Sequence, residues 1–216
     1  MTALIFDMDG VIVDSDAMHR DSWVVSNRRH GVETTDEMLR WMHGKRNDQI
    51  VRHYFGDGLA AEEVDRRGRA KERVYRELAA GRTEELLMPG LRAFLERHRD
   101  LPMAVGSNAE PENVAFVLGE TGLRPYFRAV VDGHQVHNPK PHPDVYLRAA
   151  ELLEIEPANC IVFEDSPSGA AAATAAGMRV IGLRTTYDSL PGAVLTVDNF
   201  LSGVLEPWLQ AQLRSV

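Results

Sequence analysis

The apolar residues of this chain follow two different patterns, and the change between them divides the sequence into parts. A short unbroken apolar run at residues 3–6 opens the chain and is typical of a buried parallel strand. Between residues 15 and 88 the apolar positions instead recur at helical spacing. Short breaks separate these segments at Gly31, Gly44, Gly56–Gly58 and Gly81. We expect a bundle of about four helices in this region.

From residue 89 onward, short apolar runs alternate with amphipathic segments. Strands are expected at 102–106, 130–131, 161–163 and 180–181, the last of which closes the alternation. Helices are expected at 91–99, from Pro111, at 145–153 and at 168–176. Such alternation implies βαβ units and a parallel sheet, which the opening strand at 3–7 would join.

The sequence therefore predicts the α/β class, with a parallel sheet core flanked by helices. Residues 1–14 and 89–216 are expected to form this core. Residues 15–88 are predicted to be an inserted α-helical cap domain. Because the insertion directly follows the first strand, we expect it to act as a lid over the carboxyl end of that strand.

Composition narrows the class of protein. The chain has 216 residues, 44% of them hydrophobic and 26% charged, which is typical of one large or two modest globular domains. The formal net charge of -8 argues against a nucleic-acid or anionic-membrane partner, but it permits a small anionic substrate. No apolar run reaches the roughly 18 residues of a membrane span, and the first residues do not resemble a signal peptide.

The only cysteine, Cys160, begins an apolar run and is expected to be buried, so no intrachain disulfide can form. We expect a cytoplasmic protein with no obligate protein partner.

Two acidic residues follow the opening strand, in Asp7-Met8-Asp9-Gly10. Residues two apart leave a strand on the same side, so both carboxylates can face a site at its carboxyl end, where ligands bind in open α/β sheets. Carboxylates held this close repel one another, and a hard cation such as Mg²⁺ would stabilise the pair. The alternative is a turn with two solvated acids.

Two further strands end in polar residues. Ser107-Asn108 follows the strand at 102–106 and offers hydroxyl, amide and backbone N–H donors for an anion. Glu164-Asp165 follows the strand at 161–163 and offers more carboxylates for a cation. The alternative for both is ordinary helix capping.

Lys140 lies in a stiff loop between these two segments. Prolines flank it in Asn138-Pro139-Lys140-Pro141-His142-Pro143, and each proline fixes its backbone φ angle. The chain has only two other lysines, Lys45 and Lys71. A rigidly held ammonium would balance the charge of a site crowded with carboxylates and a phosphoryl group. The alternative is a solvated loop lysine.

These motifs, in this order and at strand ends, resemble those of the haloacid dehalogenase-like hydrolases. More narrowly, the chain resembles the sugar-phosphate phosphatases and β-phosphoglucomutases, which have a Rossmann-like core and a helical cap inserted after the first motif. The resemblance extends over essentially the whole chain. The motifs that carry it are Asp7-x-Asp9-Gly10, Ser107-Asn108, Lys140 and Glu164-Asp165.

The resemblance implies a role for each acidic residue. Asp7 would be the nucleophile that forms an aspartyl phosphate, while its other oxygen binds Mg²⁺. Asp9 would protonate the leaving alcohol and then activate water, and its backbone carbonyl would reach the metal. Asp165 would be a metal ligand, and Glu164 would contribute directly or through water.

The resemblance also assigns the phosphoryl and substrate contacts. Ser107, Asn108 and Lys140 would orient and neutralise the phosphoryl oxygens. It further implies that the Lys140-Pro141 bond is cis. In the helical insertion, the candidates for substrate contact are His19, Arg46 and Lys71, with solvated helix faces as the alternative for each.

The favoured function is a Mg²⁺-dependent phosphatase that acts on a small phosphorylated metabolite. The expected substrate class is the sugar phosphates. A hexose-phosphate mutase is the main alternative. Two features favour the phosphatase: the Gly-x-Arg-x-Asp pattern at Gly44, Arg46 and Asp48, and the sequence Ser107-Asn108-Ala109.

Three other functions fit less well. A non-enzymatic phosphoryl-receiver domain shares the strand-end aspartate, metal site and lysine, but it lacks the large insertion and an acid equivalent to Asp9. A haloacid dehalogenase needs the nucleophile but no metal, so the presence of Asp9 together with Glu164-Asp165 argues against it. A phosphonate hydrolase would need a cap lysine, for which Lys45 and Lys71 are available.

Overall fold

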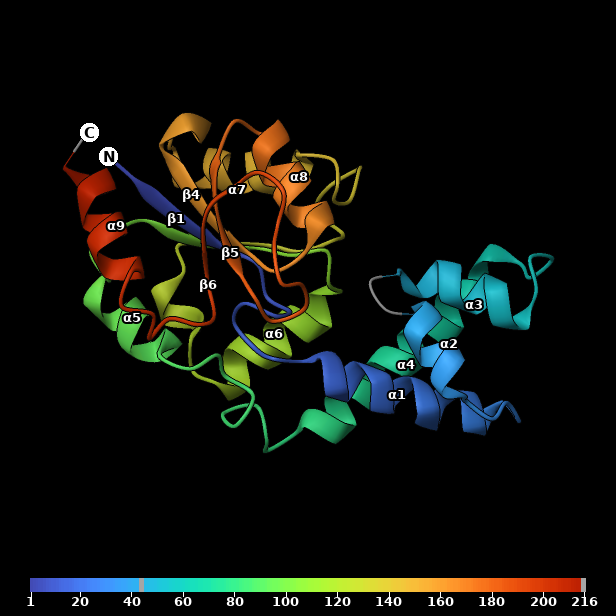
Figure 1. Ribbon diagram of the computed structural model, residues 1–216. Coiled ribbons are helices and arrows are strands. Elements are labelled where there is room, and N and C mark those ends of the chain that lie inside the picture. The colour runs from blue at the N-terminus through green and yellow to red at the C-terminus, as the bar shows by residue number, and fades with distance from the viewer. Residues whose placement is uncertain (43–44, 215–216) are drawn as a thin grey trace. The chain divides into compact units, whose positions relative to one another are not determined.

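A computed structural model describes residues 1–42 and 45–214 of the chain (Figure 1). These residues divide into two compact units. The sheet unit combines residues 1–14 with the chain from Thr83 onward, and the helical unit is Ser15–Arg82. Among the residues described, no helix combines the length and apolar character that crossing a membrane requires.

The sheet unit is built on one six-stranded sheet in the order β3-β2-β1-β4-β5-β6. All neighbouring strands pair in parallel. The strands are β1 (Ala3–Phe6), β2 (Met103–Gly106), β3 (Ala129–Val131), β4 (Cys160–Glu164), β5 (Arg179–Leu183) and β6 (Ala193–Val197). The predicted α/β fold with a Rossmann-like parallel sheet is confirmed. Since β1 lies between β2 and β4, the carboxyl ends of the three motif-bearing strands are adjacent.

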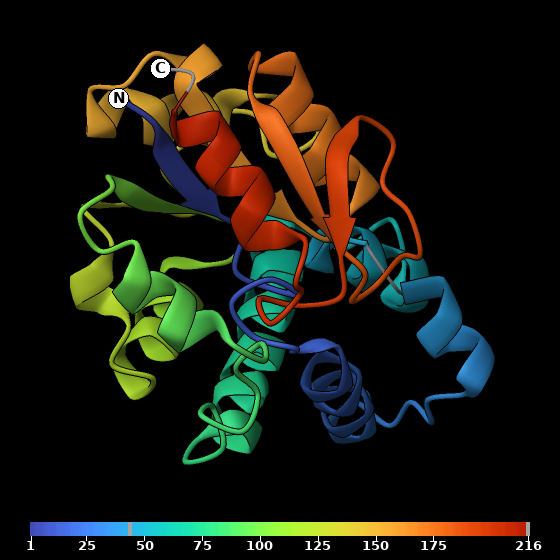
Figure 2. The same cartoon turned by 60° about the vertical axis from the view of Figure 1, so that its left-hand side comes forward.

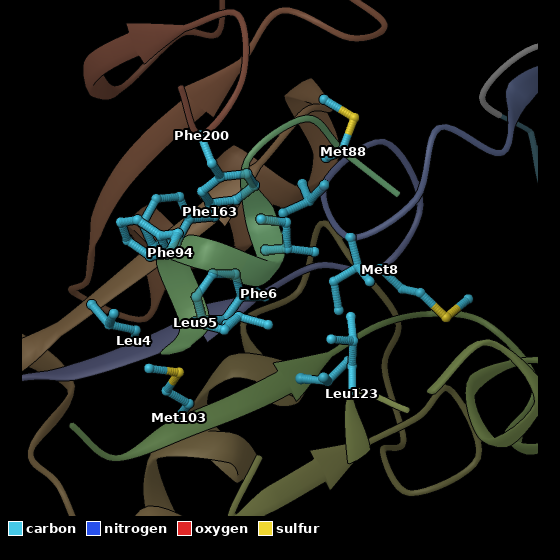
Figure 3. Close-up of a cluster of buried hydrophobic side chains, with 14 of the residues drawn as sticks. Leu4, Phe6, Met8, Met88, Phe94, Leu95, Met103, Leu123, Phe163 and Phe200 are labelled. Atoms are coloured by element: carbon cyan, nitrogen blue, oxygen red, sulfur yellow. The ribbon is translucent and has the colours of Figure 1, made fainter. Parts of the chain in front are cut away.

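The central strand is apolar throughout because both of its faces are covered. Leu4 and Phe6 point into one hydrophobic cluster, and Ala3 and Ile5 into another. Phe6 stacks on Phe163 of β4 with ring centroids 4.8 Å apart, and Figure 3 shows these two rings among further aromatic side chains. The burial of large side chains on both faces fixes the register in which β1 delivers its final residues.

Helices form the outer layers of the sheet unit. They are α5 (Leu91–Arg97), α6 (Pro111–Glu120), α7 (Asp144–Leu153), α8 (Pro167–Ala175) and α9 (Leu205–Leu213), with short 3₁₀ turns at Arg124–Tyr126 and Pro157–Asn159. Side chains of α5, α6 and α9 pack in the cluster around Phe6, whereas α7 and α8 pack in the cluster around Ile5. Figure 2 shows α9 against one face of the sheet.

The expectation that the strand at 180–181 closes the alternation was wrong, because β6 and α9 follow it. β6 is an edge strand whose residues are mostly half-exposed, with Val194 53% exposed, although its sequence, Ala193-Val194-Leu195-Thr196-Val197, is largely apolar. The Pro191-Gly192 turn before β6 was an available signal. For α9, the helical spacing of Leu205, Leu209 and Leu213 was another.

The helical unit contains four helices in its described residues, which confirms the predicted bundle. They are α1 (Asp16–Arg29), α2 (Asp36–Met42), α3 (Asn47–Phe55) and α4 (Ala61–Ala79). A core of buried side chains joins all four: Trp23, Met42, Ile50, Val51 and Val64. The expected break at Gly44 lies outside the described residues.

The sequence pattern placed the end of the helical insertion at residue 88. In the structure, the chain returns to the sheet unit before that residue. The Asp14 N–H donates to Leu86 O at 2.8 Å, and the Met88 N–H donates to Ile12 O at 3.0 Å. Met88 is buried in the cluster around Phe6. Residues 86–88 therefore lie beside residues 12–14 within the sheet unit.

Candidate active site

Asp7 directly follows β1 and lies at the centre of the sheet's carboxyl edge. Its N–H still donates to Phe163 O of β4, at 3.0 Å, so its backbone is held by the sheet. The residue is 8% exposed. A carboxylate is thus buried at the end of the central strand, and its neighbours must stabilise the charge.

Asp9 is placed by a turn rather than by the alternation of a strand. β1 ends at Phe6, and the chain then turns so that the Ile12 N–H donates to Met8 O at 2.8 Å. The Gly10 N–H donates to Val13 O at 2.7 Å, which fixes the peptide plane between Asp9 and Gly10. Asp9 is half-buried. Its charge raises the pKa of Asp165, so both acids belong to one electrostatic environment.

Glu164 and Asp165 meet Asp7 at the end of β4. Each of these three residues offers a carboxylate oxygen, and the three oxygens lie within 4.8 Å of one another. All three residues are buried. Helix α8 begins immediately afterward, with Ser166 as its N-cap and Pro167 at its first position. This start turns the chain away from the site directly after the two acids.

Lys140 supplies the ammonium group in this cluster. Its Nζ lies 2.8 Å from Asp7 Oδ1 and 2.7 Å from Glu164 Oε1. The side chain is almost fully buried, and Nζ lies 4.7 Å from the centre of the Tyr146 ring. The Lys140-Pro141 peptide bond is cis, which confirms that expectation. The prolines and these contacts together direct Lys140 into the site.

Five donors surround the Glu164 carboxylate. Oε1 accepts from Lys140 Nζ at 2.7 Å and from the Tyr146 hydroxyl at 2.8 Å. Oε2 accepts from the N–H groups of Asp165 and Ser166 and from Ser166 Oγ, at 2.8–3.0 Å. A carboxylate has roughly four lone-pair sites, so its hydrogen-bonding capacity is filled. Glu164 has the geometry of an anchor for Lys140, and direct metal binding by Glu164 stays a prediction.

The carboxylates differ in how the site shifts their pKa. Burial raises the pKa of Asp7 well above its ordinary value, and the charges of Glu164 and Asp165 add to this against the opposing effect of Lys140. Burial and the Glu164 charge raise the pKa of Asp165 to about 7. Burial also disfavours the charge on Glu164, but Lys140 and the hydrogen bonds outweigh it and lower that pKa. Of these three carboxyl groups, Glu164 is therefore the one whose charged form the site favours.

These charges fit a divalent cation. Three buried carboxylates and one ammonium leave two negative charges in the cluster when all are ionised. The cluster offers carboxylate oxygens, which are the ligands that Mg²⁺ prefers. The residues present are thus suited to a hard divalent ion.

Ser107 and Asn108 lie at the end of β2, beside β1. Ser107 is 2% exposed, and its hydroxyl oxygen accepts the Ala109 N–H at 3.0 Å, so its own O–H can still donate. Asn108 Oδ1 accepts the Lys140 backbone N–H at 3.1 Å. The side chain of Asn108 therefore fixes the lysine loop, and its amide nitrogen keeps donors for an anion.

The three cap candidates lie within the helical unit, where two of them meet. Lys71 is 2% exposed, and its Nζ lies 2.7 Å from His19 Nδ1 and 2.9 Å from Glu72 Oε1. Asn47 donates to the same Glu72 oxygen at 2.6 Å. Arg46 is exposed at the start of α3, with its Nε 3.1 Å from Asp48 Oδ1. The Gly44 of the Gly-x-Arg-x-Asp pattern lies outside the described residues.

Three residues of the site were not predicted from the sequence. The sequence pattern around Tyr146 is that of a core aromatic residue in an amphipathic helix. Only the structure shows that its hydroxyl group donates to Glu164. Gly169 leaves room for the Glu164 carboxylate, because any side chain at this position would overlap that group. Thr186 donates to Asp165 Oδ2 from the loop after β5, a region without a regular pattern.

Comparison with known proteins now identifies the family. The family model described as haloacid dehalogenase-like hydrolase matches residues 1–177. The chain belongs to the haloacid dehalogenase-like hydrolases. The match spans both units and includes each strand-end motif from Asp7 to Asp165.

Individual known proteins are similar to this chain over nearly their full length. The fructose-1-phosphate phosphatase YqaB of Escherichia coli is 33% identical over 181 residues, covering 84% of this chain and 95% of that protein. The β-phosphoglucomutase of Bacillus subtilis is 30% identical over 224 residues, covering 99% and 98%. A crystal structure of β-phosphoglucomutase from Clostridium difficile has a TM-score of 0.84 at 26% identity, covering 100% of this chain and 98% of that one.

Proposed function

We propose that this hydrolase is a Mg²⁺-dependent phosphatase of a small phosphorylated metabolite, with sugar phosphates as the favoured class. The observation that carries the proposal is the buried contact of Lys140 Nζ with Asp7 Oδ1 at 2.8 Å, beside Asp165. A nucleophilic carboxylate with an adjacent fixed cation is suited to a phosphoryl group, whose oxygens are negatively charged. Similarity to a fructose-1-phosphate phosphatase supports the substrate class.

In the first step, a carboxylate oxygen of Asp7 attacks phosphorus, and the bond from phosphorus to the ester oxygen breaks. The leaving alkoxide takes a proton from Asp9, so the alcohol departs neutral. In the second step, Asp9 takes a proton from water, whose oxygen attacks phosphorus and breaks its bond to Asp7. Inorganic phosphate leaves, and both residues return to their starting state.

The residues around Asp7 have separate parts in this scheme. Lys140, Ser107 and Asn108 orient and neutralise the phosphoryl oxygens. Glu164 holds Lys140 in place, with Tyr146 as a second contact. Asp7 and Asp165 would hold Mg²⁺, with the Asp9 carbonyl as a further ligand, and the ion would screen the charge of the phosphoryl group.

The helical unit is proposed to act as a cap that selects the substrate. His19 and Lys71 are the contact candidates that share one network, and Arg46 is the exposed third. We also propose a cytoplasmic location, where a free thiol such as that of Cys160 stays reduced.

A phosphate-release screen over phosphorylated metabolites tests the proposal. We expect Mg²⁺-dependent release from at least one sugar phosphate, with no release after chelation. Absence of release from every member, including generic aryl phosphates, would contradict a phosphatase.

A hexose-phosphate mutase is the second candidate, favoured by the β-phosphoglucomutase similarity over 99% of the chain. In a mutase the aspartyl phosphate is returned to a sugar rather than to water. NMR of the products from β-glucose 1-phosphate separates the two functions. Glucose 6-phosphate that accumulates faster than inorganic phosphate would establish the mutase and overturn the phosphatase.

A further inference from the structure

The loop between β5 and β6 has no part in the proposed mechanism. Two consecutive threonines of this loop, Thr185 and Thr186, nevertheless contact residues of the candidate active site. Thr185 Oγ1 donates to the Gly10 carbonyl oxygen at 2.6 Å. Thr186 Oγ1 donates to Asp165 Oδ2 at 2.5 Å. Both threonines are half-buried. The loop therefore contacts the turn after β1 and the carboxylate after β4 at the same time.

Gly10 and Thr186 confine the same oxygen of Asp165. Gly10 has a φ angle of +75°, and a Cβ atom at this position would overlap Asp165 Oδ2. The α-carbon of Gly10 thus lies directly against this oxygen, while the Thr186 hydroxyl binds it from the loop. A carboxylate with one oxygen restrained on two sides has little freedom to rotate about its last side-chain bond.

We infer that Thr186 is a positioning residue that orients Asp165 for a divalent cation, and that Thr185 secures the adjoining turn at Gly10. This inference rests on the proposed metal site. A hydroxyl that donates to Oδ2 uses one of the two lone pairs on that oxygen, so Asp165 keeps acceptor sites for a cation. Partners of this kind fix a ligating carboxylate before the metal arrives, and their loss typically lowers metal affinity by roughly 10- to 100-fold.

Thr186→Val tests this because it keeps the shape of the side chain and removes the hydroxyl. Affinity is measured with Mn²⁺ as a paramagnetic probe and with Mg²⁺ in competition, in the absence of substrate. We expect Thr186→Val to bind both ions roughly 10- to 100-fold more weakly. Thr186→Ser restores the hydroxyl and should recover most of the affinity.

Thr121→Val is the matched control, because it removes a buried hydroxyl that donates to Val117 O at 2.6 Å within the sheet unit, away from the cluster. It should bind metal like the unchanged protein. The thermal unfolding midpoint of each metal-free variant is measured alongside.

Three outcomes overturn the inference, and they can be told apart. Unchanged metal affinity in Thr186→Val, with or without a lower unfolding midpoint, would show that Thr186 only secures the loop, and it would leave the proposed phosphatase intact. Failure of the unchanged protein to bind either ion would overturn the inference together with the metal requirement of the proposed function. Should Thr186→Val not fold, weak metal binding by a folded Thr186→Ser would also contradict the inference.

Discussion

Gly169 offers a sharp test of the anchoring of Lys140 by Glu164. Gly169 is the third residue of α8, and a methyl group there would overlap Glu164 Oε1 and the carboxyl carbon, far inside the 3.0 Å that real contacts keep. The Glu164 carboxylate must therefore move if Gly169 becomes alanine. Five hydrogen bonds converge on that carboxylate, including the one from Lys140 Nζ at 2.7 Å.

The size of the effect follows from these contacts. Breaking a buried ion pair by displacing one partner costs about 3–5 kcal/mol, because it leaves an uncompensated buried charge. We expect Gly169→Ala to lower the free energy of unfolding by this amount. Lys140 also loses its second carboxylate contact, and a displacement of about 1 Å in a positioned group can cost roughly 10²-fold in rate. Phosphatase kcat/KM should fall at least that far.

Gly119→Ala is the matched control. Gly119 is exposed in α6, with nothing within 4 Å of an added Cβ, so alanine should raise the free energy of unfolding by about 0.5–1 kcal/mol. Urea unfolding and phosphate release are measured for both variants. A Gly169→Ala protein with unchanged stability and unchanged kcat/KM would refute the packing of α8 against Glu164.

Three further predictions concern the acids, the metal and the thiol. Asp7→Asn should abolish phosphate release while the protein stays folded by circular dichroism, since it removes the nucleophile but keeps its shape; retained activity would exclude Asp7 from that role. EDTA should abolish activity and Mg²⁺ rather than Zn²⁺ should restore it in the same release assay, because the cluster ligands are hard oxygens; full activity after exhaustive chelation would contradict the metal requirement. Cys160 should react with a thiol reagent only after denaturation, because burial raises its pKa to about 11 against the opposing charge of Arg179; rapid reaction of the folded protein at mildly alkaline pH would contradict its burial.

The acids at the strand ends were predictable because their placement is local. A buried parallel strand ends where its apolar run ends, and adjacent parallel strands bring their carboxyl ends together. Asp7 and Asp165 therefore meet as the sequence predicts, and Lys140 reaches Asp7 from its proline-flanked loop. The position of Asp9 was not predictable from strand alternation, because it comes from a turn closed by the hydrogen bond from Gly10 N–H to Val13 O, at 2.7 Å.

Residues that act through distant contacts were not predictable from local pattern. Tyr146 and Gly169 have ordinary helical positions, and their importance comes from touching the side chain of Glu164. Thr186 lies in an irregular loop, and only the fold brings it to Asp165. The edge strand β6, in contrast, was predictable: its sequence AVLTV is apolar and β-branched, and a Pro-Gly turn precedes it.

In the proposed mechanism, Asp7 carries the phosphoryl group in a metal-dependent site. Fluorine NMR with beryllium fluoride tests it directly, because this mimic of a phosphoryl group attaches to a nucleophilic carboxylate and needs neither a known substrate nor turnover. We expect bound fluorine resonances in the presence of Mg²⁺ that disappear in Asp7→Asn and after chelation. Resonances that persist in Asp7→Asn, or their absence from the unchanged protein with Mg²⁺, would contradict this mechanism.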